Sequence, residues 1–254
     1  MKKNNVVMLR VFSSFPKVRP PLPAEYRRVY EREYQLNRGG GSFLTRMAAA
    51  LEAWMHKRVA TISGVGTCVL ELGAGNLNHL AYENDFSNYD VVEPFKALYE
   101  SRAEIEKIRH FYDSIDDIPL ETHYQRVISI AVLEHLDSLP AIVAKSALLL
   151  TDDGVFQAGI PTEGGFLWGM AWRLSTGVGF WLRNKLPYGV LMRHEHVNDA
   201  EEIEAVVRYF FSEVRVCRYP LPLRHLSFYS YLEARRPNLA RVTEYLRTGE
   251  VSID

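Results

Sequence analysis

The sequence has little cysteine and no long uncharged apolar segment. Its two cysteines, Cys68 and Cys217, lie in short apolar runs, which predicts core packing in a reducing compartment and excludes a disulfide framework. The nearest candidate for a membrane span, residues 166–182, is interrupted by Arg173 and by glycines, whereas a spanning helix needs about 18 or more apolar residues in a row. The opening apolar run is short and is broken by Arg10, which argues against a signal peptide. We therefore expect a cytoplasmic protein.

A strong excess of either charge is also missing, because 30 basic residues stand against 31 acidic ones and the formal net charge is -1. Proteins that bind nucleic acids usually carry a broad basic excess, so we expect no nucleic-acid partner. The N-terminal arm is the uneven region, since five cations precede the first acidic residue, Glu25: Lys2, Lys3, Arg10, Lys17 and Arg19. We interpret this arm as a solvated, partly ordered segment, with contact to phosphates or a membrane surface as the alternative.

The chain length of 254 residues suits one large α/β domain with a decorated edge. No internal repeat and no low-complexity linker interrupts the sequence. The predicted organisation is therefore an N-terminal arm with a helical extension at residues 1–60, a domain at residues 61–236 and a tail at residues 237–254.

The N-terminal region opens with a proline cluster, which favours extended structure: Pro20, Pro21 and Pro23. Residues 24–36 predict a helix, because tyrosine recurs at every fourth position there. Residues 43–59 predict a second helix with an apolar stripe along one face.

From residue 67 onward, short β-rich runs alternate with helical stretches. The runs are CVLEL, YDVVEP, YQRVISIA and GVFQAGIP. This alternation predicts a parallel sheet built from βαβ units, with helices covering both of its faces. Residues 199–210 predict a further helix, with Asn198 as its cap and Glu201 completing a capping box. Two strands, at residues 213–218 and 225–234, follow that helix.

The segment at residues 69–79, VLELGAGNLNH, predicts a strand that runs into a glycine turn and then a helix. Gly73 and Gly75 allow the backbone to pass close to a ligand, and the helix after them would present free N–H groups. A dinucleotide fingerprint would have a third glycine where this chain has Asn78. The carboxylate of Glu71 would repel a pyrophosphate but suits a cationic ligand such as the sulfonium of S-adenosylmethionine (SAM).

The next predicted strand ends in VVEP at residues 91–94. A carboxylate at the tip of a second strand, here Glu93, can accept hydrogen bonds from both hydroxyls of a ribose. The glycine turn and this acid together fit NAD as well as SAM, so at this point both cofactors stay open.

Three ordered motifs together resemble those of class I SAM-dependent methyltransferases. They are ELGAG at residues 71–75, VEP at 92–94 and IAVLEHL at 130–136, within a similarity that spans about residues 67–162. The resemblance implies a Rossmann-like, doubly wound α/β fold, with a mostly parallel seven-stranded sheet that ends in a C-terminal antiparallel hairpin. It also implies SAM as the cofactor, with contacts from Glu71, Gly73, Ala74, Gly75, Asn78, Glu93, Pro94, Asp113, Ser114, Ile130 and Ala131.

In that family a polar segment after the third strand usually contacts the adenine ring, and here it corresponds to residues 112–117. The commonest pattern is an acidic residue just before a small one. The sequence departs from it, so the choice between Asp113 and Ser114 stays open. No clustered acids typical of a metal-dependent subfamily are present, and we expect no metal.

Methyl transfer from a sulfonium is an in-line displacement, so positioning and water exclusion can supply much of the catalysis. A base is needed only for a hydroxyl or a protonated amine, and the candidates are His135, His194 and His196. If the segment around the last two is extended, they point the same way. They would then form a base or two ligands of a metal site that lacks an evident third ligand.

An insert at residues 162–192 separates the fifth predicted strand from the capped helix. It is rich in glycine and also in large aromatic residues, which include Trp168, Trp172, Phe180 and Trp181. Our hypothesis is that it forms a lid or an acceptor pocket. The alternatives are an extra packed helix pair, or a surface that touches lipid or a protein partner.

These features predict a SAM-dependent methyltransferase that acts on an oxygen or nitrogen of a small-molecule or glycan-type acceptor. The aromatic insert would suit a sugar ring or a lipid-linked saccharide, and so also peripheral contact with a membrane. Two alternatives remain: an NAD-dependent oxidoreductase, which the missing third glycine disfavours, and a non-catalytic SAM-binding scaffold.

Overall fold

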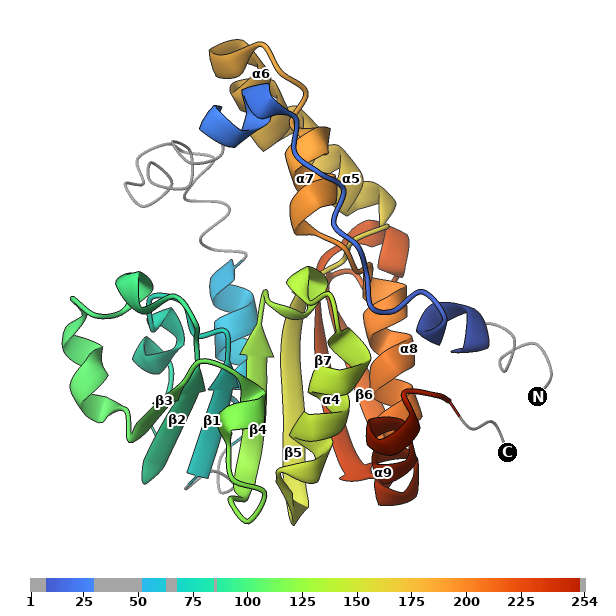
Figure 1. Cartoon of the computed structure of the whole chain (residues 1–254). Helices are drawn as coiled ribbons and strands as arrows, with labels where there is room; N and C mark the ends of the chain where they lie inside the picture. Colours follow the sequence, from blue (N-terminus) through green and yellow to red (C-terminus); the bar gives the residue numbers. More distant parts are fainter. Residues whose placement is uncertain (1–7, 30–51, 63–67, 85, 252–254) are drawn as a thin grey trace.

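The computed structural model describes residues 8–29, 52–62, 68–84 and 86–251. In these residues the strands form one seven-stranded sheet with the order β3-β2-β1-β4-β5-β7-β6 (Figure 1). The strands are β1 Cys68–Leu72, β2 Asn88–Val92, β3 His110–Tyr112, β4 Tyr124–Ile130, β5 Leu150–Pro161, β6 Phe211–Pro220 and β7 Ser227–Pro237. Only β7 runs antiparallel to its neighbours. This arrangement confirms the predicted Rossmann-like, mostly parallel sheet with a C-terminal antiparallel hairpin.

The strands are nearly continuous in apolar residues because both faces of the sheet are covered. One core joins the sheet to the long helices α4 Leu139–Leu148, α8 Ala200–Phe210 and α9 Leu239–Thr248. The other core packs the helix at residues 52–59 onto the opposite face, through Met55 and Val59. Alternate residues of β1 divide between the two cores, since Leu70 belongs to the first and Val69 to the second.

The first connections of the sheet are shorter than predicted. In the described residues between β1 and β3, the helices are the 3₁₀ turns η1 Asn78–Ala81, η2 Lys96–Leu98 and η3 Ala103–Lys107. We predicted a helix directly after the glycine turn. The structure has a 3₁₀ turn of only four residues there, η1, so the prediction is wrong about the type of element. Leu77 precedes η1 in the left-handed region, with φ 62°. His79 and Leu80 bury their side chains and so fix this turn on the protein. The turn therefore does not need the long apolar face by which a regular helix packs on a sheet.

Helix α8 confirms the helix predicted at residues 199–210, but its cap lies one residue later than predicted. Asp199 accepts hydrogen bonds from the N–H groups of Glu201 and Glu202, and Glu202 completes the capping box. Asn198 instead donates its side-chain amide to the carbonyls of Leu133 and Leu136, each at 2.8 Å. Both residues are good caps in isolation, and this tertiary contact decides between them.

The two C-terminal strands are longer than predicted, because β6 starts directly after α8 and β7 extends to Pro237. Helix α9, in the segment predicted as a tail, packs on α4 and α8 and buries Val242. The described part of that segment therefore contributes to the first core. Cys68 and Cys217 are both free thiols.

The described part of the N-terminal arm, from residue 8 onward, is docked on the protein rather than solvated, which corrects our interpretation of this part. Lys17 pairs with Glu202 at 2.6 Å, and Arg19 pairs with Asp137 at 3.1 Å. Residues 24–29 are helical, as predicted for the start of the first helix. The rest of that helix, the start of the second, and Lys2 and Lys3 lie outside the described residues.

The insert is helical and rises above the carboxyl ends of the parallel strands (Figure 1). It consists of α5 Phe166–Trp172, the π-helical turn η6 Arg173–Gly177, α6 Val178–Asn184 and α7 Gly189–Glu195. Leu22 and Tyr26 of the arm pack against Phe180 and Leu191 in a small core of their own. Within the described residues, no helix is long and apolar enough to cross a membrane.

Candidate functional site

A cavity of about 770 Å³ lies at the carboxyl ends of β1, β2 and β4, which is where ligands bind in open α/β sheets. Seven of the residues predicted from the sequence to form the site line it together: Gly73, Glu93, Pro94, Asp113, Ser114, His135 and His194. Arg19 of the arm also lines it and donates to the carbonyls of His135 and His194. The arm therefore helps to close a cavity whose other walls come from the ends of the strands, from α4 and from α7.

The glycine turn that enters this cavity depends on its two glycines for different reasons. Both have left-handed φ angles, 66° at Gly73 and 52° at Gly75. A Cβ on Gly73 would lie 2.5 Å from the Val132 side chain, so this position is also crowded by the protein itself. A Cβ on Gly75 would meet no atom within 4 Å. The backbone at Gly75 is therefore open, and its N–H donates to Glu93.

Glu93 follows β2, and two backbone N–H groups hold its carboxylate in place. Oε2 accepts from Gly75 and Oε1 accepts from Phe95, both at 2.9 Å. The residue is 5% exposed but lines the cavity. Each carboxylate oxygen can accept two hydrogen bonds, so each retains one acceptor direction for a ligand.

Asp113 and Ser114 follow β3, and their side chains have different tasks. The Ser114 hydroxyl accepts from the N–H of Asp116 as the cap of η4 Ile115–Asp117. The N–H of Ser114 donates to Asp117, which completes a capping box. Asp113 is exposed at the cavity. Of the two candidates for the adenine contact, Ser114 thus caps the local turn, whereas the carboxylate of Asp113 does not take part in that cap.

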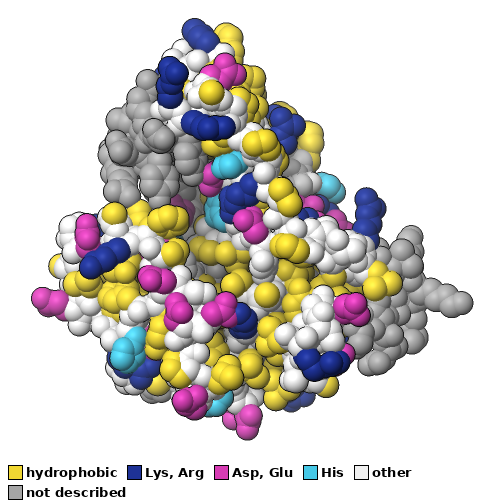
Figure 2. All heavy atoms as spheres, viewed as in Figure 1, with side chains coloured by type: hydrophobic (Ala, Val, Ile, Leu, Met, Phe, Trp, Pro, Cys, Tyr) yellow, Lys and Arg dark blue, Asp and Glu magenta, His cyan; other side chains and the backbone are white. Residues whose placement is uncertain are grey.

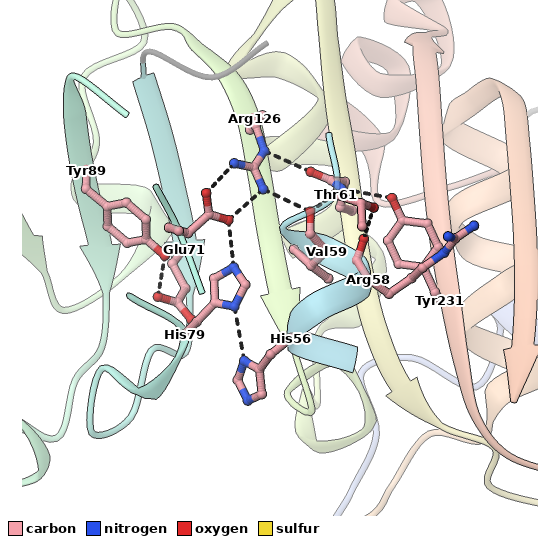
Figure 3. A network of polar contacts seen from close by, with 11 residues as sticks. His56, Arg58, Val59, Thr61, Glu71, His79, Tyr89, Arg126 and Tyr231 are labelled. Carbon is pink, nitrogen blue, oxygen red and sulfur yellow. Dashed lines mark hydrogen bonds and ion pairs between the residues drawn. The ribbon is translucent and has the colours of Figure 1, made fainter. Parts of the chain in front are cut away.

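Glu71 lies behind the cavity wall rather than on its surface. It accepts a hydrogen bond from the Tyr89 hydroxyl at 2.7 Å and is 3% exposed (Figure 3). Burial raises the pKa of Glu71 above its ordinary value, an effect that His79 and Tyr89 offset only in part. Any influence of Glu71 on a cavity ligand would act through its electric field, without contact.

The sequence did not reveal a buried polar network behind the glycine turn (Figure 3). Both terminal nitrogens of Arg126 donate to Glu83 at 2.7 Å, and the guanidinium also binds Gln157 and the carbonyl of Val59. Glu83 in turn pairs with His79 at 2.8 Å. Burial alone would raise the pKa of Glu83, but hydrogen bonds with His79 and Arg126 lower it to about 2.

This network connects β4 and β5 to the helix at residues 52–59 and to the turn after the glycines. His79 reaches the helix because its Nδ1 lies 3.0 Å from Nδ1 of His56. Arg126 is 1% exposed, so its charge is balanced within the protein rather than by solvent. One signal in the sequence could have indicated this network, namely the arginine in the predicted strand YQRVISIA. A charged side chain in a fully buried strand requires a partner.

Besides Glu71 and Gly75, four predicted cofactor residues lie outside the cavity lining. Ala74 and Ile130 belong to the second core. Asn78 is exposed on η1. Ala131 has a left-handed φ of 54° at the end of β4 and donates its N–H to the carbonyl of Gly159.

Two of the three predicted catalytic histidines lie close together. His135 ends the 3₁₀ turn η5 Leu133–His135 directly after β4, and its ring meets that of His196 edge-on, with centroids 4.8 Å apart. Nδ1 of His135 lies 2.8 Å from the carbonyl of Glu195, and Nδ1 of His196 lies 2.7 Å from a carboxylate oxygen of Glu163. The sequence analysis missed Glu163.

His194 lies apart from this pair, in α7, where its Nδ1 lies 2.8 Å from the carbonyl of Pro20. The predicted condition that the segment is extended is wrong, because α7 is helical up to Glu195. His194 and His196 therefore face different surroundings. Among the described residues, no group of three or more side chains is placed to hold a metal ion.

Burial and the surrounding acids act in opposite directions on His196. Burial alone would lower its pKa, but Glu163, Glu134 and Glu195 raise the pKa of His196 above the ordinary 6.5. Glu134 is itself fully buried, and burial raises its pKa although His135 and His196 oppose this. The His196 imidazole is therefore more basic than a free one, and its contact with Glu163 is a main cause.

A second cavity, of about 640 Å³, lies inside the insert. Glu163 and His196 line it on one side, while α5 and α7 supply its other walls. Its lining combines two indole rings with several glycines: Trp168, Trp172, Gly165, Gly169, Gly177 and Gly189. Because His135 lines the first cavity and its ring contacts His196 of the second, the linings of the two cavities meet at this histidine pair.

The chain has the fold of class I SAM-dependent methyltransferases. A possible histamine N-methyltransferase from Thermotoga maritima superimposes with a TM-score of 0.55 at 14% identity, covering 90% of this chain and 99% of the other. NodS from Bradyrhizobium japonicum, an N-methyltransferase in complex with S-adenosylhomocysteine, gives 0.53 at 12% identity, covering 91% and 99%.

A carbon methyltransferase, CurJ, is similar over a smaller part of its length. It gives a TM-score of 0.51 at 20% identity and covers 73% of this chain, which spans 55% of the CurJ chain. No family model and no curated protein matches the sequence. At these identities the similarity defines the fold, and the neighbours include enzymes that methylate nitrogen and carbon.

Proposed function

We propose that the protein is a SAM-dependent methyltransferase that binds SAM in the 770 Å³ cavity. Glu93 would accept hydrogen bonds from the ribose hydroxyls, and Asp113 would accept one from the exocyclic amine of adenine. The glycine turn would lie beside the methionine portion, where the open backbone at Gly75 leaves room. The observation that carries this proposal is Glu93, a fixed carboxylate with an acceptor direction left on each oxygen.

The geometry after the glycine turn favours SAM over NAD. A dinucleotide places its pyrophosphate against the N-terminus of an α-helix, whose free N–H groups and dipole stabilise the charge. Here the turn leads into the four-residue η1, the carboxylate of Glu93 accepts from the turn itself, and Glu71 lies behind the cavity wall. This surrounding suits a sulfonium and an ammonium better than a pyrophosphate.

We propose that the acceptor occupies the second cavity and that His196 is the base for an oxygen or a protonated nitrogen. SAM supplies a methyl group on sulfur. The acceptor atom would form a new bond to the methyl carbon as the bond between this carbon and sulfur breaks, and the electron pair of the broken bond would stay on sulfur. His196 would receive the acceptor proton on Nε2, because Nδ1 pairs with Glu163. Glu163 is therefore a positioning residue, which holds the ring and increases its basicity.

The indole rings of Trp168 and Trp172 suit a flat or ring-shaped acceptor, such as a small heterocycle or a sugar unit. This is a narrower form of the small-molecule or glycan-type acceptor predicted from the sequence.

Calorimetric titration with SAM, S-adenosylhomocysteine and NAD tests the cofactor. We expect micromolar binding of the first two and none of NAD. Binding of NAD without SAM would falsify the proposal. Incubation with labelled SAM and fractionated cell extracts then separates an enzyme from a non-catalytic scaffold, because only an enzyme transfers label to a second molecule.

A further inference from the structure

The insert carries large apolar side chains that face solvent. They recur at intervals of three or four residues through α5, η6 and α6, which places them along one side of the helical run. They are Phe166, Met170, Leu174, Val178, Trp181 and Leu182, and each is at least 40% exposed. We call this set the apolar ridge. Figure 2 shows hydrophobic and basic side chains, with an acidic side chain among them, at the top of the molecule, where Figure 1 places α6.

The ridge is not needed to hold the insert together. Other side chains of the same helices do so, since Phe180 is buried against Leu22 and Tyr26 of the arm. Trp168 and Trp172 face the second cavity and make ring contacts with Tyr229 and Tyr188. The same helices thus have one side built into the protein and another left apolar and open. Exposed apolar patches of this kind mark sites of interaction.

The helical run that carries the ridge, from α5 to α6, contains charged residues of a single sign. Between Glu163 and Glu195 the sequence has no acidic residue and four cations: Arg173, Arg183, Lys185 and Arg193. All four are exposed, in a chain whose net charge is -1. Lys185 lies 4.9 Å from the ring centroid of Trp181, so cation and indole lie together at the end of the ridge. Trp, Leu and Phe beside basic residues are the composition of helices that lie in a membrane interface.

We propose that the apolar ridge binds the surface of an anionic phospholipid membrane. The ridge side chains enter the boundary between headgroups and acyl chains, while the cations around them contact lipid phosphates. The short helices of the insert lie on the membrane without crossing it. A second copy of the chain fits less well, because a symmetric pairing of two ridges would bring like charges together. This proposal does not depend on methyl transfer, since it needs neither cofactor nor acceptor.

Sedimentation with vesicles tests the proposal on the full chain. The vesicles are phosphatidylcholine alone, or phosphatidylcholine mixed with phosphatidylglycerol. We expect binding to the mixed vesicles that weakens as salt is added, and much weaker binding to phosphatidylcholine alone. The ridge variant Leu174→Glu with Trp181→Glu should lose at least about tenfold in affinity, because two apolar side chains no longer enter the interface. Lys185→Ala should lose about fivefold.

A matched control pair exists elsewhere on the surface. Leu120 and Leu239 are 69% and 51% exposed, against 67% and 50% for Leu174 and Trp181. The variant Leu120→Glu with Leu239→Glu therefore changes the charge equally and removes two apolar side chains of similar fractional exposure, and it should bind mixed vesicles like the unchanged chain. S-adenosylhomocysteine affinity and the thermal midpoint show whether each variant is folded. If the double variant Leu174→Glu with Trp181→Glu is unfolded, the vesicle binding of Lys185→Ala decides whether the proposal holds.

Three results would overturn the proposal. The first is an unchanged chain that does not bind mixed vesicles. The second is an equal effect of the ridge and control pairs. The third is self-association in the absence of lipid that the ridge pair abolishes, which would assign the ridge to a second copy of the chain. None of them bears on the methyltransferase proposal, which calorimetry tests separately.

Discussion

Glu93 combines two tasks, because the hydrogen bonds that fix its carboxylate also connect the glycine turn to the end of β2. Glu93→Ala should weaken SAM binding by about 1–3 kcal/mol, the scale of lost hydrogen bonds to a charged group. Calorimetry with SAM measures this. Glu100→Ala, at an exposed acid close by in the sequence, is the control and should leave the affinity unchanged. An unchanged affinity in Glu93→Ala would mean that the ribose lies elsewhere.

The pairing of His196 with Glu163 predicts a pH dependence at the scale of one residue. The pKa of His196 should lie above 6.5 in the unchanged chain and fall in Glu163→Gln, because the acid raises it. NMR titration of the imidazole signals measures both values. Since the folded pKa is raised, the pairing stabilises the fold fully below pH 6.5, and this stabilisation is lost as pH rises through the folded value.

Other acidic residues lie close to His196, so the effect of Glu163 on the His196 pKa needs a control. Glu134 and Glu195 also raise the pKa of His196, whereas Glu201 is exposed and pairs with Arg224. Glu201→Gln should leave the titration of His196 unchanged. A Glu163→Gln variant with the same His196 pKa as the unchanged chain would remove the basis for Glu163 as its positioning residue.

At the scale of elements, the sequence predicted those whose signal is local. The strands and α8 follow from apolar runs and a capping pattern. The cap itself was misplaced by one residue, because Asn198 and Asp199 are both good caps. Only the contact of Asn198 with the carbonyls of Leu133 and Leu136 selects Asp199. The 3₁₀ turn after the glycines was missed for a similar reason, since buried His79 in this turn contacts His56, a residue that is distant in sequence.

The insert carries the prediction that belongs to this scale. Trp168→Ala with Trp172→Ala should raise the acceptor KM, because both rings line the second cavity, while SAM affinity stays within about twofold. SAM affinity can be measured by calorimetry at once, and KM when an acceptor is known. Trp181→Ala is the matched control, because this ring lies on the apolar ridge outside the cavity. A collapse of SAM affinity in the double variant would contradict an acceptor role.

For the whole molecule, the motifs in the sequence predicted the sheet and the cavity at its carboxyl edge. Gly73, Glu93 and Asp113 come from separate strands, and parallel strands bring their ends to one edge, so their meeting was predictable. The second cavity was less predictable, because it depends on how α5 and α7 pack within the insert. The buried network was not predicted at all. Its members, His56, Glu83 and Arg126, are far apart in the sequence and have no shared motif.

This network yields the last prediction, which concerns the stability of the whole fold. Arg126→Met alone should lower the free energy of unfolding by about 3–5 kcal/mol, because it leaves Glu83 charged and buried. Adding Glu83→Gln should restore part of the loss, since the unpaired charge is then gone. Denaturant unfolding measures both variants. Glu244→Gln, in the exposed pair with Arg247, is the control and should cost about 0–1 kcal/mol.

The pH dependence of unfolding shows how much of the stability comes from the charge of this ion pair rather than from the packing of its side chains. Glu83 has a pKa of about 2 in the folded chain against the ordinary 4.5. A lowered folded pKa contributes stability that is complete above pH 4.5 and is lost as pH falls towards 2. The unchanged chain should therefore lose stability over this range more steeply than a chain with Glu83→Gln. Parallel pH profiles for the two chains would mean that folding does not lower the pKa of Glu83, so that the ion pair adds no net stability.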